Sequence, residues 1–408
     1  MWHFASLRWG IVVVVLGSQA VWGQIDPERR QLIQMGYNQP LEGIAPIAAY
    51  GYFYENLPDF PRTNLTLRLA LAPIYVDAEL GIGHAIGPNT DIGIGIAGGG
   101  FADTYSELRQ GKYWREESFT GHGGEVSVNV YHRFNPGATI PLYAVLRNAL
   151  HYSLYERNGD TAPNFVIPDD QYTYHVRAGL RWGGIEPMLQ PAVALEASAW
   201  YEGAFRTDAG GYGYNSDRFV NGDSHRIWAR TALDFTHTNS LQSFEVSATA
   251  GTSIRADRLS AYRIGGMLPL AAEFPLSLPG FFYQELSARR FILFNGQYSI
   301  AADYANHWHL TAFGATALVD YLPGEEQPGA WNSGVGGGIT YLSSSQTWRI
   351  MVSYAYGLDA IRSSGRGANM VSLLCQFDLE AKHRRRATGF QPLVSPDRLR
   401  GFDWLLGR

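Results

Sequence analysis

Residue types that could carry out chemistry occur in three short groups of this sequence. Asp223-Ser224-His225 contains the types used in acyl hydrolysis, where a histidine takes the proton of an attacking hydroxyl. His307-Trp308-His309 places two imidazoles two residues apart, a spacing that puts both on one face of a strand, where they could share a metal ion. Gly93, Gly95 and Gly98 match the spelling of a dinucleotide-binding fingerprint. Whether each group could carry out this chemistry depends on the secondary-structure element that carries it.

The sequence around these groups favours structural roles. Adjacent residues on a strand point to opposite faces, so Ser224 and His225 cannot form a nucleophile–base hydrogen bond with each other, and no Gly-x-Ser-x-Gly elbow is present. The sequence fixes no third metal ligand beside His307 and His309. No helix follows the glycines of residues 93–98, which are typical of a curved strand. We therefore expect no enzyme activity, no metal and no cofactor.

The elements that carry these residues alternate apolar and polar side chains with a period of two. In residues 172–182, Tyr, Val, Leu and Trp share one face while Thr, His and Arg share the other. That is about the length of a transmembrane strand. Similar segments lie at residues 126–130, 142–154, 193–202, 227–235, 298–304, 348–356 and 371–379. The sequence predicts an all-β fold, a transmembrane antiparallel β-barrel of about 16 strands.

Composition agrees with a barrel. The chain has 408 residues with 46 Gly, 24 Tyr, 20 Phe and 11 Trp, and 17% of its residues are charged. A soluble β-sandwich or propeller would show the same alternation. The barrel is favoured because the polar faces repeatedly carry Arg, Glu and His, and because long polar connections at residues 102–121 and 203–224 contrast with a short one at 237–242.

Net charge and cysteine content bear on nucleic-acid binding, disulfides and metal clusters. A formal charge of −5 gives no reason to expect a nucleic-acid partner. The single cysteine, Cys375, excludes an internal disulfide and a cysteine-based metal cluster.

Residues 1–23 have the features of a signal peptide. Arg8 precedes the apolar run of residues 11–16, and small residues follow before Gln24. The run is too short to span a bilayer. A short buried N-terminal strand is the alternative. Export together with transmembrane strands predicts an outer-membrane protein in contact with outer-membrane lipids.

Residues 24–44 are expected to form a periplasmic arm. Asp26 suits a helix N-cap, Pro27 the first helical position and Gly36 the position after the end, which predicts a short helix. The barrel itself is then expected to span residues 45–380.

A basic tail of residues 381–408 is expected to follow the last strand into the periplasm. Lys382, Arg384, Arg385 and Arg386 could bind an anionic surface or a periplasmic protein partner. A solvated tail with no partner is the alternative.

Residues 263–283 break the alternation of the barrel. Pro269, Pro275 and Pro279 prevent strand pairing, yet bulky apolar residues such as Phe281 and Phe282 continue through the segment. An apolar segment that cannot join the sheet is expected to lie against protein rather than solvent.

The last third of the chain resembles the C-terminal barrel of the BamA/TamA outer-membrane assembly family, the bacterial surface-antigen superfamily. The similar pieces are Tyr-Arg-Ile-Gly-Gly at 262–266 and the segments 289–298, 334–339, 354–362 and 367–377. The resemblance implies a barrel of sixteen strands, with the break as a loop folded into the lumen. The loop residues it singles out are Arg263, Gly265, Gly266, Leu278, Pro279, Gly280 and Phe281.

Two departures from the family affect the expected function. Its loop carries a Leu/Val-Arg-Gly-Phe/Tyr motif whose Arg reaches the barrel wall, whereas Pro279 stands at that position here. Packing by Met267, Phe274, Phe281 and Phe282 is therefore expected to hold the loop. Its assembly members also carry periplasmic POTRA domains, for which residues 24–44 are too short.

We therefore expect a monomeric barrel without POTRA domains, acting in outer-membrane protein or lipid assembly or translocation with a separate periplasmic partner. A passive porin-like channel and a lipid-modifying enzyme are the two alternatives.

Overall fold

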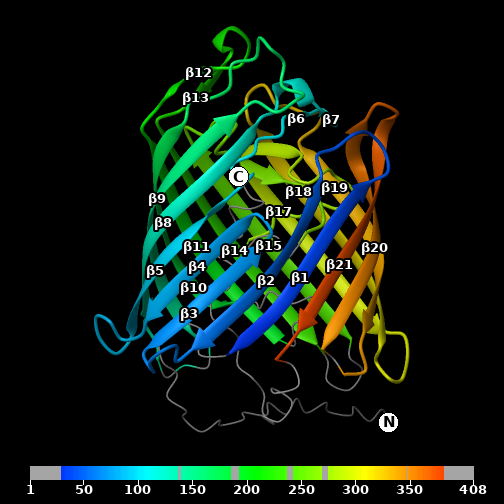
Figure 1. Cartoon of the computed structure of the whole chain (residues 1–408). Helices are drawn as coiled ribbons and strands as arrows, with labels where there is room; N and C mark the ends of the chain where they lie inside the picture. The colour runs from blue at the N-terminus through cyan, green and yellow to red at the C-terminus, as the bar shows by residue number, and fades with distance from the viewer. Residues whose placement is uncertain are drawn as a thin grey trace, which may run out of the picture.

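Antiparallel pairing between neighbours along the chain builds one sheet that closes on itself, as the computed structural model shows (Figure 1). The structure describes residues 29–136, 138, 140–184, 193–236, 242–268, 274–345 and 347–380. The sheet has 17 strands. One of them, β16 (Tyr262–Ile264), is a three-residue segment beside β17, which leaves 16 strands in the wall. The predicted all-β barrel of about sixteen strands is confirmed.

The wall strands are β1 (Arg30–Pro40), β2 (Ala48–Pro58), β3 (Leu65–Ala72), β4 (Tyr75–Ile82), β5 (Thr90–Gly99), β8 (Thr120–Arg133), β9 (Leu142–Glu156), β10 (Gln171–Gly184), β11 (Val193–Arg206), β14 (Asp223–Thr236), β15 (Ser243–Ile254), β17 (Leu286–Ala301), β18 (Trp308–Tyr321), β19 (Trp331–Leu342), β20 (Trp348–Arg362) and β21 (Gly365–Asp378). The pairing of β1 with β21 closes the barrel. No sheet edge is therefore left open between the first and last strands.

The first strand corrects the predicted helix of residues 26–36 and the predicted barrel start at residue 45. Residues 30–40 form β1, which pairs with β2 on one side and β21 on the other. Its apolar residues Ile33, Met35 and Tyr37 alternate with more deeply buried Gln34 and Asn38. Two complete ladders outweigh the local capping signals, because a short helix has little stability of its own. Residues 1–28, with the predicted signal peptide, lie outside the described part.

Side chains follow the predicted alternation. Leu146, Leu180 and Ile227 are exposed on the outer face. Arg147 and Arg181, which neighbour them in sequence, are buried on the inner face. An apolar outside and a polar inside are what a barrel surrounded by lipid requires.

The connections differ in length at the two ends of the barrel. The strand ends where β1 begins and β21 ends lie together at the bottom of Figure 1, and the longest connections lie at the top. We call the top the loop end. It carries β6 (Leu108–Arg109), β7 (Lys112–Tyr113), η1 (Arg115–Glu117), β12 (Gly210–Tyr212), η2 (Tyr214–Ser216) and β13 (Arg218–Val220). Among the described residues, no helix has the length and apolar character needed to cross a bilayer.

Candidate functional site

The connection between β15 and β17, residues 255–285, is the candidate functional site, and we call it the lumenal loop. After β16, Gly265 and Gly266 adopt φ values of 142° and 78°, which favour glycine. The chain then folds back on itself, because Gly265 N donates to Leu276 O at 2.9 Å and Leu278 N donates to Gly266 O at 3.1 Å. The predicted break is thus a hairpin-like loop, described here apart from residues 269–273.

Residues 278–281 of the lumenal loop, which we call the docking segment, pack directly on the inner face of the wall. Leu278 and Phe281 are fully buried. A Cβ atom added to Gly280 would lie 1.9 Å from Gly357 N on β20, and one added to Gly334 on β19 would lie 2.0 Å from Pro279 O. Backbone meets backbone at both contacts, so glycine on the loop and on the wall permits the approach.

Arg362, at the loop end of β20, fastens the docking segment. Its Nη1 and Nη2 donate to Glu285 Oε1 and Oε2 at 2.8 and 3.0 Å, and Nη2 lies 3.4 Å from Gly280 O. The guanidinium also lies 3.6 Å from the centre of the Phe282 ring. Glu285 Oε2 accepts a further hydrogen bond from Phe282 N at 2.7 Å. A guanidinium from the wall therefore holds the loop, although the loop itself has Pro279 at the family's arginine position.

Apolar packing contributes as expected from the sequence. Phe282 is fully buried and Met267 is 8% exposed. Phe274 is partly buried, with its ring 5.3 Å from that of Trp200 and 6.0 Å from that of Trp228. Packing alone does not account for the attachment, because the Arg362–Glu285 pair is as deeply buried as these rings.

The lumenal loop also bridges the closing seam between β1 and β21. Asn38 on β1 is the register partner of Ser372 on β21. The Asn38 amide nitrogen donates to Ser372 Oγ and Met267 O, both at 3.2 Å, and its oxygen accepts from Met267 N at 2.7 Å, in the amide orientation that satisfies these partners. Ser372 Oγ in turn donates to Met267 Sδ at 3.7 Å. Met267 of the lumenal loop therefore contacts both strands of the seam, the neighbouring pair that no turn connects.

Arg263, on β16 within the lumenal loop, connects this loop to other connections at the loop end. Its Nη1 donates to Ser287 Oγ at 2.8 Å and its Nη2 to Ser106 O at 2.9 Å. It also lies 3.8 Å from Glu325 Oε2, in the β18–β19 connection. Of the loop residues singled out in the sequence, Arg263 is thus the one that pairs with a charged side chain.

A buried charge cluster, the cap cluster, ties four loop-end connections together. Its members are Glu107, Arg109, Glu117, Arg218, Arg258 and Glu325. Arg258 Nη1 contacts Glu107 and lies 2.8 Å from Glu325 Oε1, while Arg218 Nη1 lies 3.2 Å from Glu107 Oε2. These ion pairs join residues from the β5–β8, β11–β14, β15–β17 and β18–β19 connections. The loop end is therefore covered by a cross-linked layer rather than by independent loops.

The pKa values of the two central carboxylates of the cap cluster are shifted in opposite directions. Burial disfavours ionisation of Glu107, but the Arg258, Arg218 and Arg109 guanidiniums outweigh it and lower the pKa of Glu107. Burial, reinforced by the Glu107 carboxylate, raises the pKa of Glu325. Of these two carboxylates, Glu107 is therefore the one whose ionised form the arginines favour.

Charges on the inner wall pair across neighbouring strands. Arg181 Nη2 lies 3.1 Å from Glu196 Oε2, and Arg147 contacts Glu125. Arg226 contacts Glu202. These cations and carboxylates neutralise one another, so these pairs create little net field for attracting ions.

The other residue groups weighed in the sequence do not assemble into sites. Among the described residues, no group of three or more His, Cys, Asp or Glu side chains could hold a metal ion. Ser224 is buried, whereas His225 lies 3.2 Å from Asp223 and 2.9 Å from Tyr201 OH. Lys382, Arg384, Arg385 and Arg386 lie outside the described residues.

Two residues that fasten the lumenal loop were missed in the sequence. Arg362 lies in the segment 354–362 that resembles the family, and Glu285 follows the break at residues 263–283, but the sequence predicts no contact between them. The sequence shows an arginine near the end of an expected strand, but it does not show which loop that arginine would contact.

Comparison with known proteins supports the fold. No protein-family model and no curated protein matches the chain. CdiB from Acinetobacter baumannii aligns with a TM-score of 0.55 at 11% identity, over 86% of this chain and 60% of that one. BamA from Haemophilus ducreyi lacking POTRA domains 1–3 aligns with a TM-score of 0.53 at 11% identity, over 86% and 71% of the two chains.

CdiB from Escherichia coli gives a TM-score of 0.54 at 11% identity, over 86% of this chain and 63% of that one. The chain thus spans less than two thirds of the length of both CdiB structures. At this identity the likeness concerns the fold, which is the barrel of BamA and CdiB. The resemblance to the BamA family's barrel is confirmed at that level.

Proposed function

We propose that the chain is an outer-membrane barrel that acts in protein or lipid assembly or translocation with a separate periplasmic partner. The observation that carries this proposal is the lumenal loop, docked on the inner wall and fastened by the buried Arg362–Glu285 pair. A passive pore does not require a loop that is fastened across its lumen. A barrel that opens when a partner or cargo displaces the loop depends on one.

The inner wall also supports this function over a porin-like channel. The Arg and Glu side chains that motivated the channel alternative pair with one another, as in Arg181–Glu196. The lumenal loop leaves a cavity of about 110 Å³ against the β10–β17 wall and one of about 430 Å³ beside Tyr50 on β2. Neither exceeds the roughly 300–1,000 Å³ of typical small-molecule sites.

The fold likeness to BamA and CdiB is the second support, and it motivates the outer-membrane location. Heat-modifiable gel migration in detergent tests that location. A mature chain that stays soluble without detergent would contradict it.

Three assays on the purified full chain separate the candidate functions. The proposal predicts no steady ohmic conductance, no lipid hydrolysis, and co-purification with a periplasmic protein that the substitution of Lys382, Arg384, Arg385 and Arg386 by Gln weakens. Steady ohmic conductance would favour the channel. Lipid hydrolysis abolished by Ser224→Ala would favour the enzyme.

A further inference from the structure

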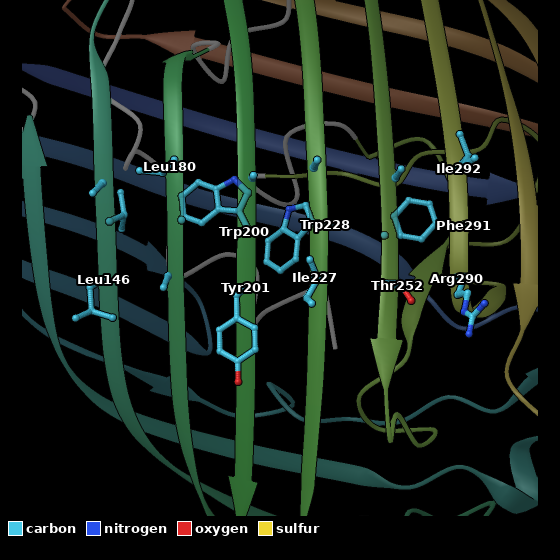
Figure 2. A pocket seen from close by; sticks show the side chains of 18 of the residues that line it. Leu146, Leu180, Trp200, Tyr201, Ile227, Trp228, Thr252, Arg290, Phe291 and Ile292 are labelled. Atoms are coloured by element: carbon cyan, nitrogen blue, oxygen red, sulfur yellow. The ribbon is translucent and has the colours of Figure 1, made fainter. Parts of the chain in front are cut away.

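The outer face of the barrel carries an apolar groove with a volume of about 1090 Å³ (Figure 2). Ala199, Ala229 and Ala250 follow one another in register across β11, β14 and β15 and form its floor. The next row toward the loop end carries the larger Tyr201 and Ile227, also in register. Three successive alanines thus leave a depression where neighbouring rows project into the surroundings.

A pair of arginines stands at one end of this groove. A β-bulge between Ala288 and Arg290 on β17 places both Arg289 and Arg290 on the exposed face. Ser253 Oγ fixes the bulge by donating to Arg289 O at 2.8 Å. Without the bulge, two consecutive side chains on a strand would point to opposite faces.

These arginines carry more positive charge than their surroundings neutralise. Arg289 Nη2 lies 2.9 Å from Asp320 Oδ2, and Arg290 Nε lies 3.9 Å from the same oxygen. The two side chains are 45% and 65% exposed. Two guanidiniums share one carboxylate, which leaves an excess of one positive charge beside the groove.

The arginines lie toward the loop end of β17, and the exposed apolar side chains of Ile292 and Phe294 follow them on the same strand. Arg290 is four residues from Leu286, where β17 begins at the loop end, which corresponds to about 13 Å along the strand. Guanidinium groups bind phosphate oxygens bidentately, and apolar grooves exclude water. A phosphate-bearing lipid combines both features.

We propose that the groove binds an anionic lipid with a phosphate head group, taken from the leaflet at the loop end. Arg289 and Arg290 bind the phosphate, and the acyl chains lie over Ala199, Ala229 and Ala250. The inference rests on the membrane location proposed above and adds a lipid-selective site that neither the lumenal loop nor the seam requires.

Native mass spectrometry of the full chain tests the site with phosphatidylglycerol and phosphatidylcholine of the same chain length. The wild type is expected to retain phosphatidylglycerol preferentially. Arg289→Gln with Arg290→Gln should weaken that retention by about tenfold or more, because two charge-assisted hydrogen-bonding groups are removed. Ala229→Leu, which fills the floor, should weaken the retention of both lipids.

Two matched controls make the test specific. Arg366→Gln removes an arginine that is 58% exposed at the same end of the barrel, outside the groove. Ala312→Leu enlarges an exposed alanine on β18, also outside the groove. Both should retain phosphatidylglycerol like the wild type, and inorganic phosphate alone should not stay bound.

Equal retention of the two lipids by the wild type would overturn the proposal. So would an equal loss in Arg366→Gln and the double arginine variant, since that would reflect general surface charge. Heat-modifiable migration of each variant shows that it has folded. A folded barrel that shows no lipid preference refutes only the proposed lipid site in the groove. A chain that stays soluble without detergent refutes the proposed membrane location.

Discussion

Replacing Arg362 with alanine is expected to release the lumenal loop from the wall. The change leaves the Glu285 carboxylate buried without the guanidinium that binds both of its oxygens. Breaking a buried pair by removing one partner costs about 3–5 kcal/mol. Loss of the cation over Phe282 adds about 0.5–2 kcal/mol. The strand ladders remain intact, so the cost falls mainly on docking of the loop.

Equilibrium unfolding in detergent measures this cost as a change in the free energy of unfolding. Arg366→Ala is the matched control, because Arg366 lies 3.7 Å from Asp359, is 58% exposed, and should contribute less than about 1 kcal/mol. Glu285→Gln and the Arg362→Ala/Glu285→Gln double variant complete a mutant cycle. Glu285→Gln should cost far less free energy of unfolding in the Arg362→Ala background than in the wild type. Equal losses for Arg362→Ala and Arg366→Ala would refute a fastening role for Arg362.

Three further predictions concern the docking segment, the cap cluster and the seam. Gly280→Ala should lower the free energy of unfolding by more than the roughly 1–2 kcal/mol of a left-handed alanine, since its Cβ would also meet β20 at 1.9 Å. Because the pKa of Glu107 is lowered, its ionised form stabilises the cap above its unfolded pKa of about 4.3, and protease protection of the loop end should fall as pH drops through the lower folded value. Asn38→Cys with Ser372→Cys, in a Cys375→Ser background, should form a disulfide that a non-reducing gel detects, because the two positions are register partners.

Each of these predictions has its own control. Gly296→Ala adds a Cβ that meets no atom within 4 Å and should change little. Glu107→Gln should abolish the acid-dependent part of the protease sensitivity, and persistence of that part would assign it to another group. Gln34→Cys with Ser372→Cys is four residues out of register, about 13 Å, and should not cross-link. Cross-linking of that pair instead would refute the seam register.

The barrel could be predicted from the sequence because apolar and polar residues alternate with a period of two, which shows which side chains face outward. Residues 172–182 illustrate this, with Leu180 exposed and Arg181 buried as their alternation predicted. The first strand was mistaken for a helix because Asp26, Pro27 and Gly36 are local signals, whereas β1 is stabilised by partners that include β21 at the other end of the chain.

The candidate site was less predictable because its contacts join distant segments. The break at residues 263–283 identified the lumenal loop, since prolines and bulky aromatic residues can be recognised within one segment of the sequence. The Arg362–Glu285 contact joins residues 77 positions apart. The β17 bulge that turns Arg289 outward depends on its register with β18, which no single segment specifies.

Conductance in planar bilayers tests the central claim most directly, namely that the lumenal loop closes the barrel and that Arg362 holds it there. The wild-type chain is predicted to show no steady conductance, and Arg362→Ala to show openings under the same conditions. Steady ohmic conductance of the wild type, unchanged in Arg362→Ala, would contradict the account.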